Sequence, residues 1–166
     1  TGLQPDGHLL ALNSYENRVL QVGIEDQPPM IAKFYRPLRW SDEAIIEEHE
    51  FSSELAAEEI PVVAPWQSNE AGPLFSHEGF RFALFPRRGG RAPEPGDLDQ
   101  LEWIGRFIGR IHLDGQARPF AHRPSLDTAS MGWTARDSVL NSPLLPPLER
   151  EGYAEASKAL LNEIQR

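Results

Sequence analysis

Residues 30–55 read MIAKFYRPLRWSDEAIIEEHEFSSEL, and this stretch decides the fold class. Its first six residues form an apolar run with one lysine inside it, and Pro37 ends the strand that this run predicts. Ser41 then offers a helix N-cap, and the two acidic residues after it lie where the helix dipole favours negative charge. We expect the helix to run to about Glu59, so the stretch predicts a strand followed at once by a helix.

Two shorter apolar runs precede this strand. Residues 8–12 form the first, and Leu20, Val22 and Ile24 alternate with Gln21 and a glycine in the second, which is the period of a half-buried strand. Polar residues separate the two runs, and a turn with two prolines follows the second. Three short strands joined by tight turns predict an antiparallel meander.

The chain after the predicted helix supplies more sheet and then a crossing segment. We expect residues 62–66 to begin a fourth strand, and the alternating residues 80–85 to form a fifth that Pro86 closes. Residues 87–96 are rich in arginine, glycine and proline, which is typical of a linker.

The rest of the chain predicts helices. Asp97 is a suitable N-cap, with Gln100 three residues later. An apolar stripe at helical spacing follows, which we expect to be buried: Leu101, Ile104, Ile108 and Ile111. We expect a loop-rich crossing over residues 114–148, where prolines are frequent, and a final helix over residues 149–166.

The predicted fold class is therefore α+β, with an antiparallel sheet and one helix that lead into a helical region. We place the N-terminal lobe at residues 1–86, a hinge or linker at residues 87–96, and the start of a helical lobe at residues 97–166.

Composition narrows the class of protein. The 166 residues carry 16 Lys and Arg against 25 Asp and Glu, and this net charge of −9 argues against nucleic acid as the main partner. The absence of cysteine excludes disulfides, thiolate metal sites and cysteine nucleophiles. No apolar run approaches the roughly 18 residues of a membrane-spanning helix, and the sequence begins without a signal peptide. We expect a cytoplasmic protein without a membrane partner.

Lys33 is the first candidate for a functional residue, because it lies in the middle of an apolar strand. A lysine directed toward the core needs a counter-ion or a phosphate, whereas a lysine on an edge strand can face water, and this segment alone leaves both open. The next helix offers Glu47, Glu48 and Glu50 as counter-ions. Glu48 is closest to the apolar face, because it precedes Phe51 by three residues.

The polar turn at residues 13–17 is the second candidate. Ser14 could offer its hydroxyl and neighbouring backbone N–H groups to phosphate oxygens. The turn contains no glycine, so it is neither a Walker loop nor a Gly-x-Gly-x-x-Gly loop. An ordinary hairpin turn, in which Asn and Ser serve turn geometry, is the alternative.

Several motifs together resemble one family, the bacterial stress response kinase A family, whose members are Ser/Thr protein kinases built on the aminoglycoside phosphotransferase and choline kinase fold. The motifs are NSYENRV (13–19), AKFYRP (32–37), EEH (47–49), IPVVAP (60–65) and GFRFALFP (79–86), followed by DQLE (99–102) and IGRFIGRIH (104–112). The resemblance is dense over residues 8–112 and thin afterwards. It implies the N-terminal lobe of a protein-kinase-like domain and the first helices of the C-terminal lobe.

The resemblance also implies roles for single residues. The turn with Asn13 and Ser14 would lie over ATP in place of a glycine-rich loop. Lys33 would hold the α- and β-phosphates, and Glu48 would pair with Lys33, with Glu47 as the alternative. Ile31 would touch the adenine, and residues 84–88 would offer backbone hydrogen bonds to it. The expected cofactors are ATP and Mg²⁺.

One part of the family pattern is missing. Such kinases need a loop of the form His-Gly-Asp-x-His-x-Gly-Asn, which supplies the catalytic Asp and a magnesium ligand, and a later Asp that also binds the metal. The sequence does not contain it. His112 and Asp114 imitate its beginning, but Pro119 stands where the Asn should be. We therefore expect no catalytic or metal-binding residue in this chain, and we expect that residues 1–166 alone are inactive and bind ATP weakly.

The expected activity of the whole protein is transfer of the ATP γ-phosphoryl group to hydroxyls of a protein substrate in a stress response. Two alternatives stay open. The first is phosphoryl transfer to a small molecule such as an aminoglycoside or an amino alcohol, because the fold supports both substrate classes. The second is a binding or regulatory module without catalysis.

Overall fold

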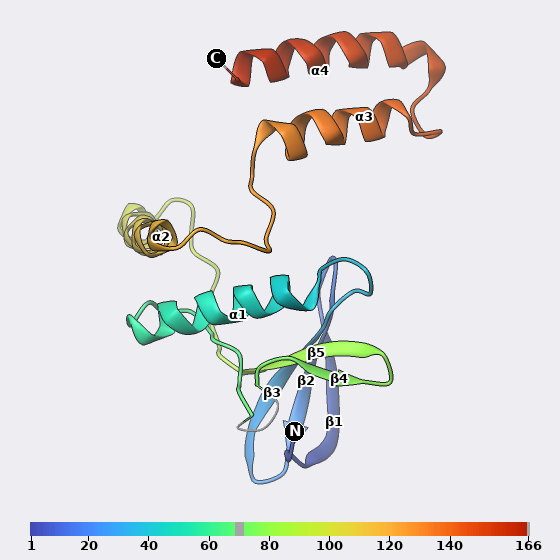
Figure 1. The fold of residues 1–166 in the computed structure, drawn as a ribbon. Coiled ribbons are helices and arrows are strands. Elements are labelled where there is room, and N and C mark those ends of the chain that lie inside the picture. Colours follow the sequence, from blue (N-terminus) through green and yellow to red (C-terminus); the bar gives the residue numbers. More distant parts are fainter. Residues whose placement is uncertain (69–71, 166) are drawn as a thin grey trace. The chain divides into compact units, whose positions relative to one another are not determined.

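The computed structural model describes residues 1–68 and 72–165. Its strands are β1 (Pro5–Leu12), β2 (Arg18–Ile24), β3 (Gln27–Phe34), β4 (Phe75–His77) and β5 (Phe80–Pro86). Its α-helices are α1 (Asp42–Ala57), α2 (Leu98–Ala117), α3 (Ala135–Leu140) and α4 (Arg150–Ile164), with a π-helical segment η1 (Thr128–Thr134) and a 3₁₀ turn η2 (Pro147–Glu149). Figure 1 shows these elements in order, and they confirm the α+β class.

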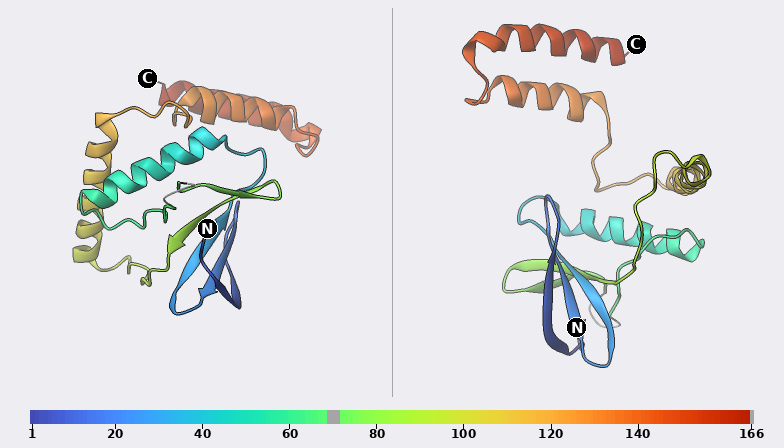
Figure 2. Two further views of the ribbon diagram at one scale, coloured as in Figure 1. Left: turned by 60° about the horizontal axis from the view of Figure 1, so that its bottom comes forward. Right: turned by 180° about the vertical axis from the view of Figure 1, so that it is seen from behind.

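The five strands form one antiparallel sheet in the order β1-β2-β3-β5-β4. The predicted meander is present as β1, β2 and β3, and β4 and β5 form a hairpin against its far edge. Strand β3 lies in the middle, so both of its edges are hydrogen-bonded to neighbours. Helix α1 runs along one face of this sheet, as Figure 2 shows from two further sides.

The fourth strand lies later in the chain than the sequence predicts. Residues 62–66 form no strand, and the backbone N–H of Trp66 donates one hydrogen bond to the Leu84 carbonyl at 2.7 Å. Pro61 and Pro65 have no N–H to donate, so this segment is poorly suited to a ladder. The strand is instead β4, which reaches β5 through Glu78 and Gly79, with φ values of 48° and 81°.

The sheet register assigns each side chain to a face. Lys33 of β3 lies opposite Val19 of β2 and Ala83 of β5, and Ile31 lies opposite Gln21 and Phe85. Residues directly opposite one another share a face. This face carries Lys33 and is covered by α1, where Tyr35, Ile45 and Ala83 form a buried cluster.

The other face of the sheet has a core of its own. Ala32, Leu84 and Phe75 are buried there, packed against partly buried residues that include Trp66 and Phe82. The rings of Trp66, Phe75, Phe82 and Phe34 follow one another with centroid distances of 5.9, 5.4 and 5.3 Å. Aromatic rings at these separations contribute beyond their buried area. The sheet is thus packed on both faces around β3 and β5.

Helix α1 begins as the sequence predicts. The Ser41 hydroxyl accepts a hydrogen bond from the Ala44 N–H at 3.2 Å, and the first turn carries Asp42 and Glu43. Ile45 is fully buried and Ala44 nearly so, whereas the neighbouring Ile46 is 37% exposed. The buried residues fix the face that α1 turns toward the sheet.

Helix α2 also begins at its predicted cap, since Asp97 accepts a hydrogen bond from the Gln100 N–H at 3.0 Å. Its apolar stripe is less buried than we expected, with Leu101 42% and Ile108 46% exposed. Two arginines connect this part of the chain to α1 and the residue after it: Arg110 of α2 donates to the Glu58 carbonyl at 2.6 Å, and Arg118, directly after α2, donates to Glu54 at 2.8 Å.

The chain forms two compact units, residues 1–122 and residues 123–166. The second unit contains η1, α3 and α4 in a stretch where we expected mostly loop before residue 149, so that expectation was wrong. Gly132 of η1 lies so close to Leu161 of α4 that a Cβ there would be 2.5 Å from a leucine methyl. Arg136 of α3 donates to Ser157 at 3.1 Å. The boundary predicted at residues 87–96 separates two kinase lobes, which is a different division from these two units, and it stays a prediction.

In the part of the chain that the structure describes, no helix is both long enough and apolar enough to span a bilayer.

The packing of α1 on the sheet gives a test of the fold. Replacing Ile45 by Ala should lower the free energy of unfolding by about 2–5 kcal/mol, because it removes a fully buried side chain at the helix–sheet contact. Ile46→Ala on the same helix is the matched control and should lose clearly less, because Ile46 is 37% exposed. Urea unfolding of both variants measures the difference, and equal losses would contradict the described packing.

Candidate functional site

Lys33 and Glu48 form an ion pair on the face of the sheet that α1 covers. The Lys33 Nζ lies 3.1 Å from Glu48 Oε1, and the side chains are 24% and 35% exposed. Because β3 is the central strand, Lys33 is not an edge-strand lysine. The strand lysine and the helix glutamate are therefore placed together as the sequence predicts.

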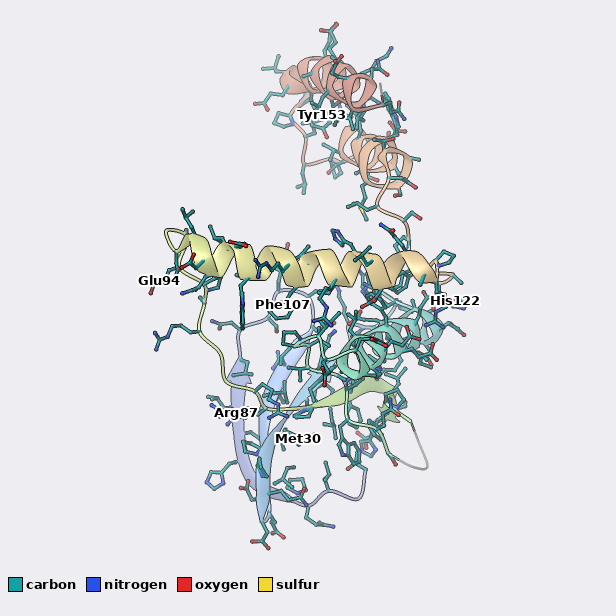
Figure 3. The ribbon with its side chains drawn as sticks, turned by 90° about the vertical axis from the view of Figure 1, so that its left-hand side faces the viewer. Met30, Arg87, Glu94, Phe107, His122 and Tyr153 are labelled. Carbon is teal, nitrogen blue, oxygen red and sulfur yellow. The ribbon has the colours of Figure 1, made fainter. Side chains whose placement is uncertain are left out.

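Glu47 has a different position. Its carboxylate accepts hydrogen bonds from the backbone N–H groups of Ala121, at 2.6 Å, and His122, at 3.0 Å. Figure 3 shows His122 beside α1, at the opposite end of α2 from Glu94. Glu47 thus connects α1 to residues 121–122, which follow α2. Lys33 pairs with Glu48.

Two residues that the sequence analysis did not propose as functional form a second contact next to this ion pair. The Lys33 Nζ lies 4.8 Å from the centroid of the Tyr35 ring, which is a cation–π distance. The Tyr35 hydroxyl is 2.6 Å from Nε2 of His49, which follows Glu48 on α1. Tyr35 is 4% and His49 1% exposed. Spacing along β3 puts Tyr35 on the face of Lys33, but no sequence signal marks His49 as its partner.

His49 is held in its neutral form. Burial lowers the pKa of His49 from its ordinary value of 6.5 to about 4, an effect that Lys33 strengthens and Glu48 opposes. Its ring meets Phe85 edge-on, at 6.1 Å and 84°. A neutral imidazole has one nitrogen that donates and one that accepts. Depending on the tautomer, Nε2 either donates a hydrogen bond to the Tyr35 hydroxyl or accepts one from it.

The other predicted binding residues lie at two places in the same unit. Ile31 is half-buried on the face of Lys33, two residues before it. Asn13 and Ser14 are exposed in the turn between β1 and β2, and they line a cavity of about 820 Å³ that also reaches Phe34 and Phe80. That cavity therefore lies at the turn rather than at the ion pair.

The turn is tied to the chain after β3 by two contacts. Glu16 pairs with Arg39 at 2.6 Å, and the Asn17 side-chain oxygen accepts a hydrogen bond from the Arg36 N–H at 3.3 Å. Within the turn, the Ser14 hydroxyl donates to the Asn17 carbonyl. Arg87, where the chain leaves β5, donates to Gln21 at 3.0 Å across the sheet face that carries Ile31.

Metal ligands were not expected in this chain. Over residues 1–68 and 72–165, we find no group of three or more His, Asp or Glu residues that could hold a metal ion.

Comparison with known proteins identifies the family. The family model described as "Phosphotransferase enzyme family" (APH) matches residues 8–165. The chain belongs to this family. A phosphotransferase of the APH family is a kinase-like enzyme, and the described part of this member includes the sheet with its strand lysine and helix glutamate.

The curated relatives of this APH-family chain are named kinases. It is 40% identical over 163 residues to stress response kinase A of Salmonella choleraesuis, covering 98% of the chain and 49% of that protein. The same kinase of Escherichia coli K12 is 39% identical, over 96% of the chain and 48% of its own length. The relative in Salmonella typhimurium is named serine/threonine protein kinase RdoA. The chain thus spans about half the length of these relatives.

A solved structure shows the same fold. The amicoumacin kinase hAmiN, in complex with AMP-PNP, Ca²⁺ and Ami, superposes with a TM-score of 0.74 at 16% identity, covering 98% of this chain and 50% of its own. The kinase-like fold of the APH family therefore extends to this chain.

The neutral state of His49 predicts a pH dependence. Since the folded pKa is about 4 and the ordinary value is 6.5, the unfolded chain takes up a proton first as the pH falls. The free energy of unfolding should therefore fall between pH 6.5 and pH 4, by on the order of 3 kcal/mol from this group. Urea unfolding at several pH values should show a shallower dependence for His49→Leu than for the wild type. His77→Leu, at an exposed site on β4, should keep the wild-type dependence. Identical curves for the wild type and His49→Leu would contradict the prediction.

Proposed function

We propose that this chain is the ATP-binding part of a kinase that transfers the γ-phosphoryl group of ATP to hydroxyls of protein substrates. The observation that carries the proposal is the Lys33–Glu48 ion pair at 3.1 Å, on the central strand of a five-stranded antiparallel sheet. A strand lysine held by a helix glutamate is the phosphate-orienting pair of kinases. Membership of the phosphotransferase enzyme family supports it.

In this proposal the Lys33 ammonium lies against the α- and β-phosphates and stabilises their charge. Glu48 keeps the ammonium directed along the sheet face, so that the phosphates meet a positioned cation. Lys33 keeps 24% of its side chain exposed, which leaves it accessible to a ligand.

We propose that the other predicted residues contact other parts of the same nucleotide. Ile31 would lie against the adenine, because it precedes Lys33 by two residues on the same face. Residues 84–88 would offer backbone groups to the adenine edge. Asn13 and Ser14 would cover the phosphates from the turn after β1, with Glu16 and Asn17 holding that turn in position.

The catalytic base and the metal ligands are proposed to lie outside this chain. The described residues do not form the oxygen-rich site that Mg²⁺ prefers, so we assign no metal-dependent step to them. The relatives are about twice as long, which leaves room for a second lobe with these groups. Such a lobe could also cover the half-exposed stripe of α2. Because ATP is the phosphoryl donor, we place the protein in the cytoplasm.

Two observations bear on the phosphoryl acceptor. The relative named serine/threonine protein kinase RdoA favours a protein hydroxyl, and the relatives named stress response kinase A favour a role in stress. The amicoumacin kinase has the same fold with a small molecule in its complex, so a small-molecule acceptor is the second candidate. A non-catalytic binding module is the third reading, and an assay of activity distinguishes it from both.

The role of Lys33 can be tested in the full-length protein. Lys33→Ala should lower kcat/KM for ATP by roughly 100-fold or more, because it removes the cation that meets the phosphates. Lys158→Ala is the matched control, since it removes the chain's other lysine at an exposed site on α4, and it should retain wild-type activity. ATP turnover that is unchanged in Lys33→Ala would refute the role proposed for this residue.

The acceptor class can be tested by measuring transfer of labelled γ-phosphate. The full-length protein should label serine or threonine in proteins of a bacterial lysate, and should not turn over a panel of aminoglycosides and amino alcohols. The opposite result would establish the small-molecule alternative, and no transfer to either class would support the non-catalytic module. Residues 1–166 alone should show no transfer, and transfer at the full-length rate would contradict the proposal that the catalytic groups lie elsewhere.

A further inference from the structure

Lys33 is held from two sides, and only one of them is the ion pair. Glu48 contacts its Nζ at 3.1 Å, while the Tyr35 ring lies with its centroid 4.8 Å from the same atom. The Tyr35 hydroxyl is in turn 2.6 Å from Nε2 of His49. We propose that Tyr35 and His49 are positioning residues that fix the Lys33 ammonium where the phosphates of the nucleotide bind. This inference rests on the proposed function, because it concerns the same site.

Two contacts join α1 to β3 and to the residue directly after it. Lys33 pairs with Glu48, and Tyr35, two residues further on the same face, pairs with His49. Glu48 and His49 are successive residues of α1. A shift or rotation of α1 would disturb both contacts together. The Tyr35–His49 bond therefore holds α1 at the rotation in which Glu48 reaches Lys33.

The aromatic ring of Tyr35 limits where the Lys33 ammonium can lie. Tyr35 is 4% exposed, so its ring is a fixed surface rather than a mobile side chain. An ammonium group over such a ring is attracted to it and loses rotamer freedom. The ring thus limits where the Lys33 head can lie in the absence of a ligand, which lowers the entropy lost when phosphates bind.

The histidine at position 49 contributes a contact that an apolar residue could not make. His49 is 1% exposed, and among the described residues its Nδ1 is buried without a hydrogen-bond partner. A buried polar atom without a partner lowers stability, and an apolar side chain would fill this space without that disadvantage. The specific contribution of His49 is therefore its Nε2 contact with the Tyr35 hydroxyl. Phe85, edge-on to the imidazole at 6.1 Å, limits the ring's movement.

The effect of Tyr35 and His49 should be confined to the phosphates of the ligand. Lys33 would touch the phosphates and not the base or the ribose. Loosening Lys33 should therefore weaken ATP binding and leave adenosine binding unchanged. A general disruption of the N-terminal lobe would weaken both ligands, so the comparison separates positioning from a structural role.

The experiment measures dissociation constants of ATP and adenosine by calorimetry on the full-length protein. Tyr35→Phe keeps the ring and removes the hydroxyl, His49→Leu removes the imidazole, and the double variant replaces the polar pair by an apolar pair. We expect each to raise the dissociation constant of ATP by roughly 5- to 20-fold and that of adenosine by less than about twofold. Tyr153→Phe and His77→Leu are matched controls and should bind both ligands as the wild type does.

A double-mutant cycle with Lys33→Ala completes the test. If the tyrosine acts through the lysine, Tyr35→Phe should have no further effect on ATP binding in the Lys33→Ala background. An additive loss in that background would overturn the inference, and so would equal weakening of ATP and adenosine. Wild-type ATP binding in all three variants would also overturn it. If the wild-type protein bound no ATP, both the proposed function and this inference would fail. If the wild type binds ATP and Lys33→Ala weakens that binding, the proposed function stands whatever the Tyr35 and His49 variants show.

Discussion

The structure of the first unit depends on a charge placed in the middle of a sheet. Lys33 lies on the central strand, and its side chain is only 24% exposed. A cation that has lost much of its water needs a partner nearby, and Glu48 provides it at 3.1 Å. Ile45 and His49 lie one turn or less from Glu48 and are buried on the same side of α1. The ion pair and the buried residues thus require one rotation of the helix.

The rotation of α1 also determines what Glu47 contacts. Successive residues of an α-helix point about 100° apart, so Glu47, two residues after the buried Ile45, lies on nearly the opposite side of α1 and points away from the sheet. It reaches the backbone N–H groups of residues 121–122 instead. Helix α1 therefore contacts the sheet through the Glu48 carboxylate and residues 121–122 through the Glu47 carboxylate. In the proposed kinase, this would link the position of Lys33 to α2, the first helix after residues 87–96.

Much of this fold could be predicted, because its signals are local. The alternation at Leu20, Val22 and Ile24 predicts a strand, and Ser41 and Asp97 mark helix starts that the structure confirms. The prediction failed where local signals were weak. Strand β4 has three residues and depends on pairing with β5, and the η1–α3 segment depends on packing against α4, where Gly132 allows close approach to Leu161. Neither dependence is visible in a short window of sequence.

The sequence by itself determined that a lysine lies inside an apolar strand, that a helix carrying Glu47, Glu48 and Glu50 follows, and that no cysteine chemistry is available. Spacing along the chain is sufficient for this, because the periods of strands and helices are fixed by backbone geometry. Only the tertiary structure decided that β3 is central, that Glu48 and not Glu47 meets Lys33, and that Tyr35 and His49 lie behind the pair. These facts depend on sheet order and on helix rotation, which are set by contacts between residues far apart in the chain.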